Sequence, residues 1–537
     1  MIRRLFSHAA TSVASGAVIV GAFSALSRVI GFLRDRILAG AFGAGDTLDV
    51  YYAAFRVPDL LFQLLVVGAL SASFIPLFTK HLDKRQDDAW RFTNIVFNAL
   101  FIVFGLVSAF AMLGMDFLVP FLVPGFSPEK QAEVVPVARI IFLAQIFFAM
   151  SMVYGSVLQG ARRFVISSFA PIVYNVGIMI GALLFAPTLG ATGLALGTVL
   201  GAFAHAVVQF IGVRSLGYRY HLIVDFLDKE LWRMVVQMVP RVMGLAVNQL
   251  NFLAMTTLAS FFAVGSLTML QFAYNLNYFP IGIVGVSYAI AAFPVFCSAV
   301  NKSDMQALRS SLLDSVRQVL FFMVPATVLF LLLRAQIVRL VVGAEAFDWQ
   351  ATIATADTLG FFAVSFVAQA LVYLVVRAYF ALQDNWTPFV VGLLSMAINV
   401  GLGLVLGERF GVAGLALAFS VATCVQFALL WAILRLRLGP LGEGVLVRST
   451  MILSVSGASA ALVTQFFKYE VVQFIALDTF YGVLFQTLIA GGAGLFIYGV
   501  AAFMLGSEEM QVFAASLRRK FLKAQRPAEP VQVDIVQ

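Results

Sequence analysis

The chain has 537 residues, of which 61% are hydrophobic and 12% are charged, and its formal net charge is +8. Soluble proteins carry about 25% charged residues and about 45–50% apolar ones, and a soluble domain of this length still exposes a large wet surface. The composition therefore excludes a cytosolic enzyme, a nucleic-acid-binding protein and a disordered protein. It predicts an all-α polytopic membrane protein, because the apolar runs are about 20 residues long, as in membrane helices rather than barrel strands.

Hydropathy predicts about fourteen membrane-spanning helices. The first is too long for a signal peptide, and no small-residue cleavage site follows Arg3 and Arg4. In chain order, the expected spans are 13–42, 47–79, 92–120, 133–158, 165–187, 191–213, 235–262, 266–297, 310–333, 353–381, 388–407, 411–434, 449–467 and 479–505.

The basic residues indicate how these helices are oriented. Lysine and arginine gather in alternate loops, and the intervening loops hold few of them. Under the positive-inside rule, this alternation predicts that both termini lie in the cytoplasm, an N-in/C-in topology. Most of the positive charge therefore serves topology, and the segment after residue 506 is expected to be a short basic tail.

The sequence also repeats itself at a nearly constant offset. Arg28-Val29-Ile30-Gly31 recurs as Arg241-Val242-Met243-Gly244, and Asn175-Val176-Gly177 recurs as Asn399-Val400-Gly401. The offset covers an even number of predicted helices, so both copies have the same orientation, as in transporters whose substrate lies between two parallel repeats. The expected regions are an N-terminal six-helix half at 1–220, a C-terminal six-helix half at 221–440, helices 13 and 14 at 441–506, and a cytoplasmic basic tail at 507–537.

Some basic residues lie inside the predicted spans. An arginine near the middle of a bilayer costs from about 3 to more than 10 kcal/mol, so it normally faces a wet cavity or a charged partner. Most of these arginines fall on the first two helices of each half, which a pseudo-twofold axis would bring together. They are Arg28, Arg34, Arg36, Arg56, Arg139, Arg241 and Arg377.

Helical spacing adds detail on the first two spans. Arg28 and Asp35 share a helix face, because they are two turns apart, whereas Arg34 is expected to point elsewhere. Arg56 and Asp59 are three residues apart and are expected to pair locally.

These residues support two interpretations. One is a cationic, amide-lined cavity for an anionic substrate such as a phosphate or pyrophosphate, which arginine binds through two hydrogen bonds. The other is structural, with the arginines paired to Asp35, Asp49 and Asp59 or extended to the membrane surface. Uncharged polar residues on the first helices of the second half would complete the cavity: Asn248, Gln249, Asn251, Gln271, Asn275 and Asn277.

No motif for catalysis or cofactor binding accompanies this cavity. The sequence contains no nucleotide-binding loop, metal motif or catalytic triad, and Cys297 and Cys424 lie far apart in apolar segments, as small buried hydrophobic residues do. We therefore expect a protein that is not an enzyme and that holds neither a metal nor a cofactor.

Several segments resemble one known family. The N-terminal signature of the MurJ/MviN family is similar to Ser27–Asp35, Phe42–Gly45, Asp49 and Ala54–Asp59. Its second and third signatures are similar to Arg377–Asp384 with Thr387-Pro388, and to Phe169–Pro171 with Asn175. The resemblance covers nearly the whole chain, including the expected number of helices.

This resemblance implies a lipid II flippase of the multidrug/oligosaccharidyl-lipid/polysaccharide exporter superfamily. Such a protein lies in the bacterial inner membrane and moves undecaprenyl-pyrophosphate-linked disaccharide-pentapeptide to the outer leaflet by alternating access. The family implies a central cavity lined by helices 1, 2, 7 and 8, and a lipid groove at helices 13 and 14. Its pattern matches Arg28, Arg34, Asp35, Asp49 and Arg56. The predicted substrate-binding residues are Arg28, Arg34, Asp35, Asp49, Arg56, Asp59, Arg241, Asn248, Gln271 and Asn275.

The chain departs from the family pattern on two helices. Many members carry a basic pair on helix 2, where this chain has Phe62 and Gln63. Many also carry an Asp-Arg pair and a following glutamate on helix 8, where this chain has Asn275 and Tyr278 among its replacements. Either the pyrophosphate contacts are redistributed over the remaining arginines, or the substrate differs.

Three alternatives to a lipid II flippase follow. The first is a flippase for another polyprenyl-pyrophosphate-linked glycan, and the second is a non-transporting membrane scaffold of cell-wall synthesis. The third is a drug or cation antiporter, which would need carboxylates rather than arginines inside the membrane. The expected partners are the lipid substrate, membrane lipids and cell-wall synthases, and no nucleic acid.

Overall fold

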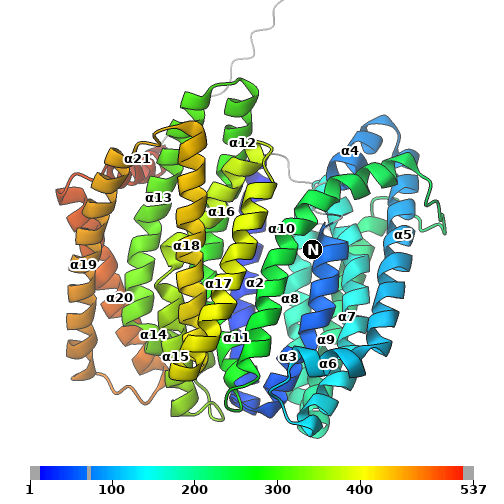
Figure 1. Ribbon diagram of the computed structural model, residues 1–537, viewed down its shortest axis with the longest axis horizontal. Coiled ribbons are helices and arrows are strands. Elements are labelled where there is room, and N and C mark those ends of the chain that lie inside the picture. The colour runs from blue at the N-terminus through cyan, green and yellow to red at the C-terminus, as the bar shows by residue number, and fades with distance from the viewer. Residues whose placement is uncertain (1–12, 69, 71–73, 524–537) are drawn as a thin grey trace, which may run out of the picture. The chain divides into compact units, whose positions relative to one another are not determined.

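The computed structural model describes residues 13–68, 70 and 74–523, except for the side chains of 13–20, 240–241, 516–517 and 519–523. Arg3 and Arg4 lie outside the described residues. Within these residues every regular element is a helix and no strand occurs (Figure 1). The all-α prediction is therefore confirmed.

Eleven helices are long and apolar enough to cross a membrane, by length and composition, within the described residues. The number rises to twelve if α15 (Trp349–Ala363) and α16 (Phe366–Ala381) form one broken span. The chain is therefore a polytopic membrane protein, whereas the total of about fourteen spans and the N-in/C-in topology stay predictions.

Two features explain why at most twelve candidate spans are found among the described residues where fourteen are predicted. α8 (Phe164–Ile180) continues into α9 (Ala186–Arg214), so that two expected spans form a single candidate of 51 residues. A kink at Gly190 divides this stretch, where a φ of +54° lies in the left-handed region that glycine adopts without strain. The first helix, α2 (Val13–Phe42), carries four charged residues between Arg28 and Arg36, which lower its hydropathy.

The helices form two compact units that are not contiguous in sequence. The first unit consists of Met1–Tyr278, Arg334–Ser365 and Gln383–Leu430, and the second of Phe279–Leu333, Phe366–Leu382 and Trp431–Gln537. Besides α2, α8, α9 and α15, the first unit contains α3 (Asp46–Phe62), η1 (Gln63–Val67), α4 (Ile75–Lys84), α5 (Gln86–Leu113), α6 (Met115–Leu122), α7 (Pro128–Gly160), η3 (Gly181–Phe185), α10 (Lys229–Ala259), most of α11 (Ser266–Ile281), α14 (Arg334–Val342), α17 (Trp386–Phe410) and most of α18 (Val412–Leu438).

Glycines allow α8 and α9 to cross at very short range. A Cβ atom added at Gly177 would collide with the backbone of Gly201, and one added at Gly197 would collide with the backbone of Gly181. Small residues spaced one turn apart are a common way for membrane helices to approach closely. α2 packs on α8, and α3 packs on α7 and α9, so this close pair supports the helices that carry the first-half arginines.

We expect Gly197→Ala to destabilise the first unit. The added methyl group must move the backbone of α8, and overpacking of this kind costs about 1–3 kcal/mol. Thermal unfolding of the purified protein in detergent should show a lower midpoint. The control is Gly105→Ala on α5, where a Cβ atom meets nothing within 4 Å, and an equal loss in both variants would contradict the explanation.

Three helices continue into short π-helical turns that lie wholly within the described residues. η1 follows α3, η3 follows α8, and η4 (Gly282–Val286) follows α11. A π-turn accommodates one more residue than an α-helical turn, and such turns are often found at functional sites. Side chains beyond each π-turn therefore point in a different direction from the one that regular α-helical spacing would give.

The second unit is built around α13. The helix α13 packs against α12, α16 and α19, and α19 packs along α20. With η4 and α16, the elements of this unit are α12 (Ser287–Asn301), α13 (Met305–Leu332), α19 (Glu443–Val472), α20 (Phe480–Met504) and α21 (Glu508–Lys523).

Part of the predicted basic tail is the helix α21, which attaches to this unit through Glu509. Arg317 on α13 donates from Nε to Glu509 Oε1 at 2.6 Å, and Ser449 on α19 donates to the same oxygen at 2.6 Å. Ser507 donates to the other carboxylate oxygen at 2.6 Å. Burial raises the pKa of Glu509, but these hydrogen bonds outweigh it and hold the pKa below its ordinary value.

The attachment of α21 should therefore depend on pH. A carboxyl group whose pKa is lowered by folding stabilises the attached state at neutral pH, and this stabilisation is lost as the pH falls through the lowered value. The protection factors of residues 508–515, which correct for the intrinsic pH dependence of hydrogen exchange, should fall in this acid range. Glu509→Gln should exchange faster at neutral pH and lose the dependence, and identical pH profiles for the two proteins would contradict this.

Candidate functional site

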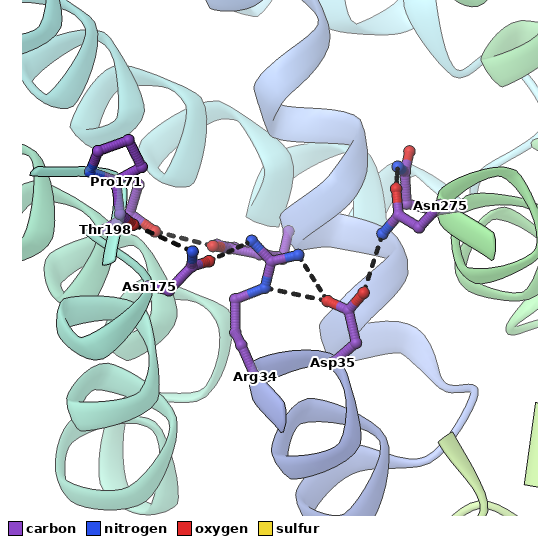
Figure 2. Close-up of polar contacts among 8 residues, drawn as sticks. Arg34, Asp35, Pro171, Asn175, Thr198 and Asn275 are labelled. Atoms are coloured by element: carbon purple, nitrogen blue, oxygen red, sulfur yellow. Dashed lines mark hydrogen bonds and ion pairs between the residues drawn. The ribbon is translucent and has the colours of Figure 1, made fainter. Parts of the chain in front are cut away.

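Arg34 and Asp35 of α2 form an ion pair inside the first unit. Arg34 donates from Nε and Nη2 to Asp35 Oδ1 at 2.9 and 2.6 Å, and the Asp35 side chain is only 4% exposed. The third contact of the guanidinium is on α8, where Asn175 Oδ1 accepts from Nη1 at 2.9 Å. Figure 2 shows Asn175 and Asp35 on opposite sides of the guanidinium. The expectation that Arg34 points away from Asp35 is wrong, because its long side chain bends back to its neighbour.

Two side-chain amides on α11 connect the Arg34–Asp35 pair to Arg56 on α3 through hydrogen bonds. Asn275 Nδ2 donates to the second oxygen of Asp35 at 3.1 Å, and Gln271 Nε2 donates to Asn275 Oδ1 at 2.9 Å. Gln271 Oε1 in turn accepts from Arg56 Nη2 at 2.7 Å. The residues Asn175, Arg34, Asp35, Asn275, Gln271 and Arg56, which we call the polar chain, therefore form one continuous hydrogen-bonded series.

Arg56 is the least neutralised member of the polar chain. The expected local pair with Asp59 does not form, since Asp59 accepts instead from Gln145 of α7 at 2.6 Å. The guanidinium lies over the ring of Phe252 at 5.6 Å, and its buried Nε has no hydrogen-bond partner among the described residues. Arg56 also lines a small cavity of about 10 Å³, enough for one water molecule, together with Phe252, Met255, Thr256, Leu270, Gln271, Tyr274 and Phe362.

Asp49 of α3 is not part of the polar chain, and it connects α3 to the start of α11 and to Lys130 of α7. The residue is 1% exposed and accepts from the main-chain nitrogens of Gly265 and Thr268 at 2.8 and 2.9 Å. The Thr268 hydroxyl and Lys130 Nζ add contacts at 2.8 and 3.0 Å. Because residues 265–268 begin α11, the carboxylate caps the positive end of that helix. Asp49 thus positions the helix that carries Gln271 and Asn275.

The remaining predicted site residues are less closely connected. Arg28 is half-buried on α2, and Asn248 is exposed on α10 and outside the polar chain. Arg241 belongs to α10, but its side chain lies outside the described residues. The structure therefore brings together Arg34, Asp35, Arg56, Gln271 and Asn275 out of the predicted set.

The other arginines within the spans have structural contacts. Arg36 Nη1 donates to Leu340 O at 2.9 Å and so caps the C-terminal end of α14, where the helix dipole favours a cation. Arg139 Nε donates to Met112 O at 2.9 Å, and in the second unit Arg377 lies over Phe293 at 5.5 Å. These contacts favour the structural interpretation for the three residues.

Sequence reasoning left two participants out of the site. Asn175 occurs in a repeated motif and in a family signature, which was the available signal for its place in the polar chain. Lys130 lies in a predicted outer loop, and nothing in the sequence indicates that it reaches Asp49. No group of three or more His, Cys, Asp or Glu side chains in the described part of the chain is arranged to hold a metal ion.

A family model described as "Lipid II flippase MurJ" matches residues 38–488 of this chain. The chain belongs to the MurJ lipid II flippase family. A probable lipid II flippase MurJ of Rhizobium tropici is 29% identical over 94% of this chain and 96% of its own length. One from Thermotoga maritima is 28% identical, covering 90% of this chain and 95% of the relative.

Solved structures agree on the fold. A lipid II flippase MurJ in an inward closed conformation has a TM-score of 0.73 at 21% identity, covering 94% of this chain and all of that chain. An inward-facing multidrug resistance transporter of the MATE family, of the MOP superfamily, has a TM-score of 0.65 at 13% identity, with 78% and 96% covered. The chain is thus a multi-pass protein of the bacterial inner membrane with a MurJ-like fold.

Proposed function

We propose that this protein moves lipid II from the inner to the outer leaflet and acts as a transporter rather than an enzyme. The proposed motion is alternating access between the halves 1–220 and 221–440, with helices 13 and 14 at 441–506 beside them. The polar chain carries the proposal, because it gathers two arginines from α2 and α3 with two amides from α11 in a membrane protein of this family. Arg28 and Arg241 are proposed as further contacts to the substrate.

The polar chain is suited to a pyrophosphate. Its two arginines and one carboxylate leave a net positive charge, and guanidinium groups bind phosphate oxygens with strong, directional hydrogen bonds. Among the described residues no carboxylate contacts Arg56, so an entering phosphate need displace only the Gln271 amide. Arg34 is held by Asp35, so a phosphate that reaches Arg34 competes with that carboxylate. We propose that Arg56 contacts the substrate first.

Depletion and complementation test this function. Depleting the protein should stop cell-wall growth and leave lipid II in the inner leaflet, and wild-type protein should restore both. Outer-leaflet lipid II that stays unchanged after depletion would exclude the proposal.

Arg56→Gln should fail to restore growth. A charge-assisted hydrogen bond contributes about 1.5–3 kcal/mol, roughly a 10- to 150-fold change in affinity. Arg139→Gln is the matched control, because Arg139 has only structural contacts, to Met112 and Asp116. Equal growth with both variants, at equal membrane levels, would favour a non-transporting scaffold of cell-wall synthesis.

A flippase for another polyprenyl-pyrophosphate-linked glycan is the second candidate. The uncharged Tyr274, Asn275 and Tyr278 favour it, because many family members carry an Asp-Arg pair and a following glutamate on this helix. Proteoliposomes that contain either lipid II or a second glycan on the same carrier would separate the two, since the true substrate should move faster. We also propose cell-wall synthases as partners, which co-purification from crosslinked membranes would test.

A further inference from the structure

The connection between α9 and α10 lies at one membrane surface. One candidate span ends at Arg214 and the next begins at Val242. Residues 218–223 between them form no helix, and Ile223 N donates to His221 O at 2.9 Å in a tight turn. The helix α10 itself begins at Lys229, well before the span. The start of α10 and the segment before it therefore lie near the headgroups of the lipid.

Two asparagines of α5 hold the irregular residues 218–223. Asn94 accepts from the hydroxyl of Tyr218 at 2.6 Å and the main-chain nitrogen of His221 at 3.1 Å, and it donates to Arg219 O at 3.2 Å. Asn98, one turn further along α5, donates to His221 O at 3.1 Å and to Ile223 O at 3.0 Å. It also accepts from the hydroxyl of Tyr220 at 2.8 Å.

These hydrogen bonds take the place of hydrogen bonds to water for the irregular backbone. The main-chain groups of an irregular segment need hydrogen-bond partners, which water normally supplies. Such a segment enters a low-dielectric region only when protein groups supply those hydrogen bonds instead. Four main-chain groups of residues 219–223 have asparagine partners. The segment is therefore able to leave water without leaving these groups unpaired.

The same segment exposes a row of apolar side chains. Leu222 is 76% exposed and Leu227 is 88% exposed, and alternate residues between them are also exposed. Trp232 on α10 is exposed as well, while its Nε1 donates to Phe226 O at 2.8 Å. Exposed apolar surface of this extent normally marks a contact with a membrane or a partner. The exposed apolar set is Tyr220, Leu222, Val224, Phe226, Leu227, Trp232, Val236 and Val239.

Basic residues accompany this apolar row. Arg214, Arg219, Lys229 and Arg233 are exposed along the same connection. Asp225, Asp228 and Glu230 lie among them, so residues 218–233 carry no formal net charge, and Arg233 pairs with Glu230 at 4.0 Å. Tryptophan and tyrosine beside lysine and arginine are nevertheless typical of segments that lie in the membrane interface. This composition and the position at the ends of two spans favour lipid over a soluble protein as the occupant.

We propose that residues 218–233 form an interfacial anchor, which inserts its apolar side chains at the headgroup–acyl boundary of the membrane. Asn94 and Asn98 act as positioning residues that hold the anchor against α5. The anchor fixes the connection between the two predicted halves to the membrane surface. This inference is independent of the transported substrate.

A fluorescent probe tests the anchor in the full-length protein. The two native cysteines, Cys297 and Cys424, are replaced by serine, and Leu227→Cys carries an environment-sensitive dye in nanodiscs of phosphatidylcholine and phosphatidylglycerol. Nitroxides attached to lipid should quench the dye more than water-soluble nitroxides do. The controls are Leu106→Cys, exposed within the α5 span, and Asp87→Cys, exposed in its first turn.

Each outcome decides the proposal. Quenching at position 227 that matches position 106 supports the anchor, and quenching that matches position 87 overturns it. A dye protected from both quenchers would show a protein partner over the segment and would also overturn it.

A second experiment tests the positioning residues. Asn94→Leu with Asn98→Leu should shift the emission of the dye at position 227 to the red and remove its quenching by lipid. Thr93→Val is the control, because the Thr93 hydroxyl bonds only to Ala89 O within α5. An unchanged emission would overturn the role of the asparagines, and the first experiment decides the anchor even if the double variant fails to fold.

Discussion

Replacing Arg34 with glutamine is expected to abolish complementation of a flippase-depleted strain. Arg34 makes three hydrogen bonds. One goes to Asn175 and holds α2 to α8, and two go to the carboxylate of its neighbour Asp35. Glutamine cannot supply a cation for a phosphate, and it leaves Asp35 buried without its ion-pair partner. Breaking a buried pair in this way costs about 3–5 kcal/mol of stability, so the single variant should also unfold at a lower temperature.

A double variant separates transport from folding at this position. Arg34→Gln with Asp35→Asn removes both charges, so that no unpaired charge stays buried and thermal stability in detergent should return close to that of wild type. Lipid II flipping should nevertheless stay abolished, because the cation is missing. Full flipping by this stable double variant would show that the pair is structural. Arg34→Lys keeps the charge but cannot contact Asp35 and Asn175 together, so intermediate growth is expected.

Replacing Asp49 with alanine is expected to cause a loss of stability as large as that of Arg34→Gln. The change leaves two main-chain nitrogens at the start of α11 without their acceptor, and it leaves Lys130 with only the exposed Asp46 as an ion-pair partner. The loss of a buried charged partner should lower the free energy of unfolding by about 3–5 kcal/mol. Thermal unfolding and the yield of folded protein from membranes measure it.

Two further variants define what Asp49 does. Asp49→Asn keeps one acceptor oxygen, which can serve either Thr268 or Gly265 but not both, and it loses the charge. Its loss of stability should therefore be smaller than that of Asp49→Ala. Adding Lys130→Met to Asp49→Asn should recover part of that loss, because the lysine then has no missing partner. If Asp49→Asn folds as well as wild type yet fails to flip lipid II, Asp49 contacts the substrate and the structural explanation is wrong.

The sequence was sufficient for the helical class and for most of the polar chain. An arginine inside a span needs a polar environment, so the residue types on a few helices already pointed to Arg34, Arg56, Gln271 and Asn275. The connections between them were not predictable, because side-chain reach rather than helical spacing joins Arg34 to Asp35. Asp49 and the start of α11 are more than 200 residues apart, and no local pattern encodes a contact at that separation.

Helical periodicity also fails at the π-turns. Arg56, Asn175 and Asn275 each lie six or seven residues before the first residue of a π-turn, namely Gln63, Gly181 and Gly282. That distance is about two turns of helix. The extra residue shifts the phase of everything beyond the turn, so a face assigned from the first half of each helix does not carry over to its second half.

The equal spacing of these three π-turns has a mechanical consequence. A π-turn that reverts to α-helical hydrogen bonding passes its extra residue along the helix, which rotates the part beyond it by about 100° without breaking the helix. In α3, α8 and α11, the π-turn lies about two helical turns beyond a member of the polar chain. Such a rotation would leave the hydrogen bonds of the charged groups in place, so the part of each helix that rotates would differ from the part that carries the proposed substrate contacts.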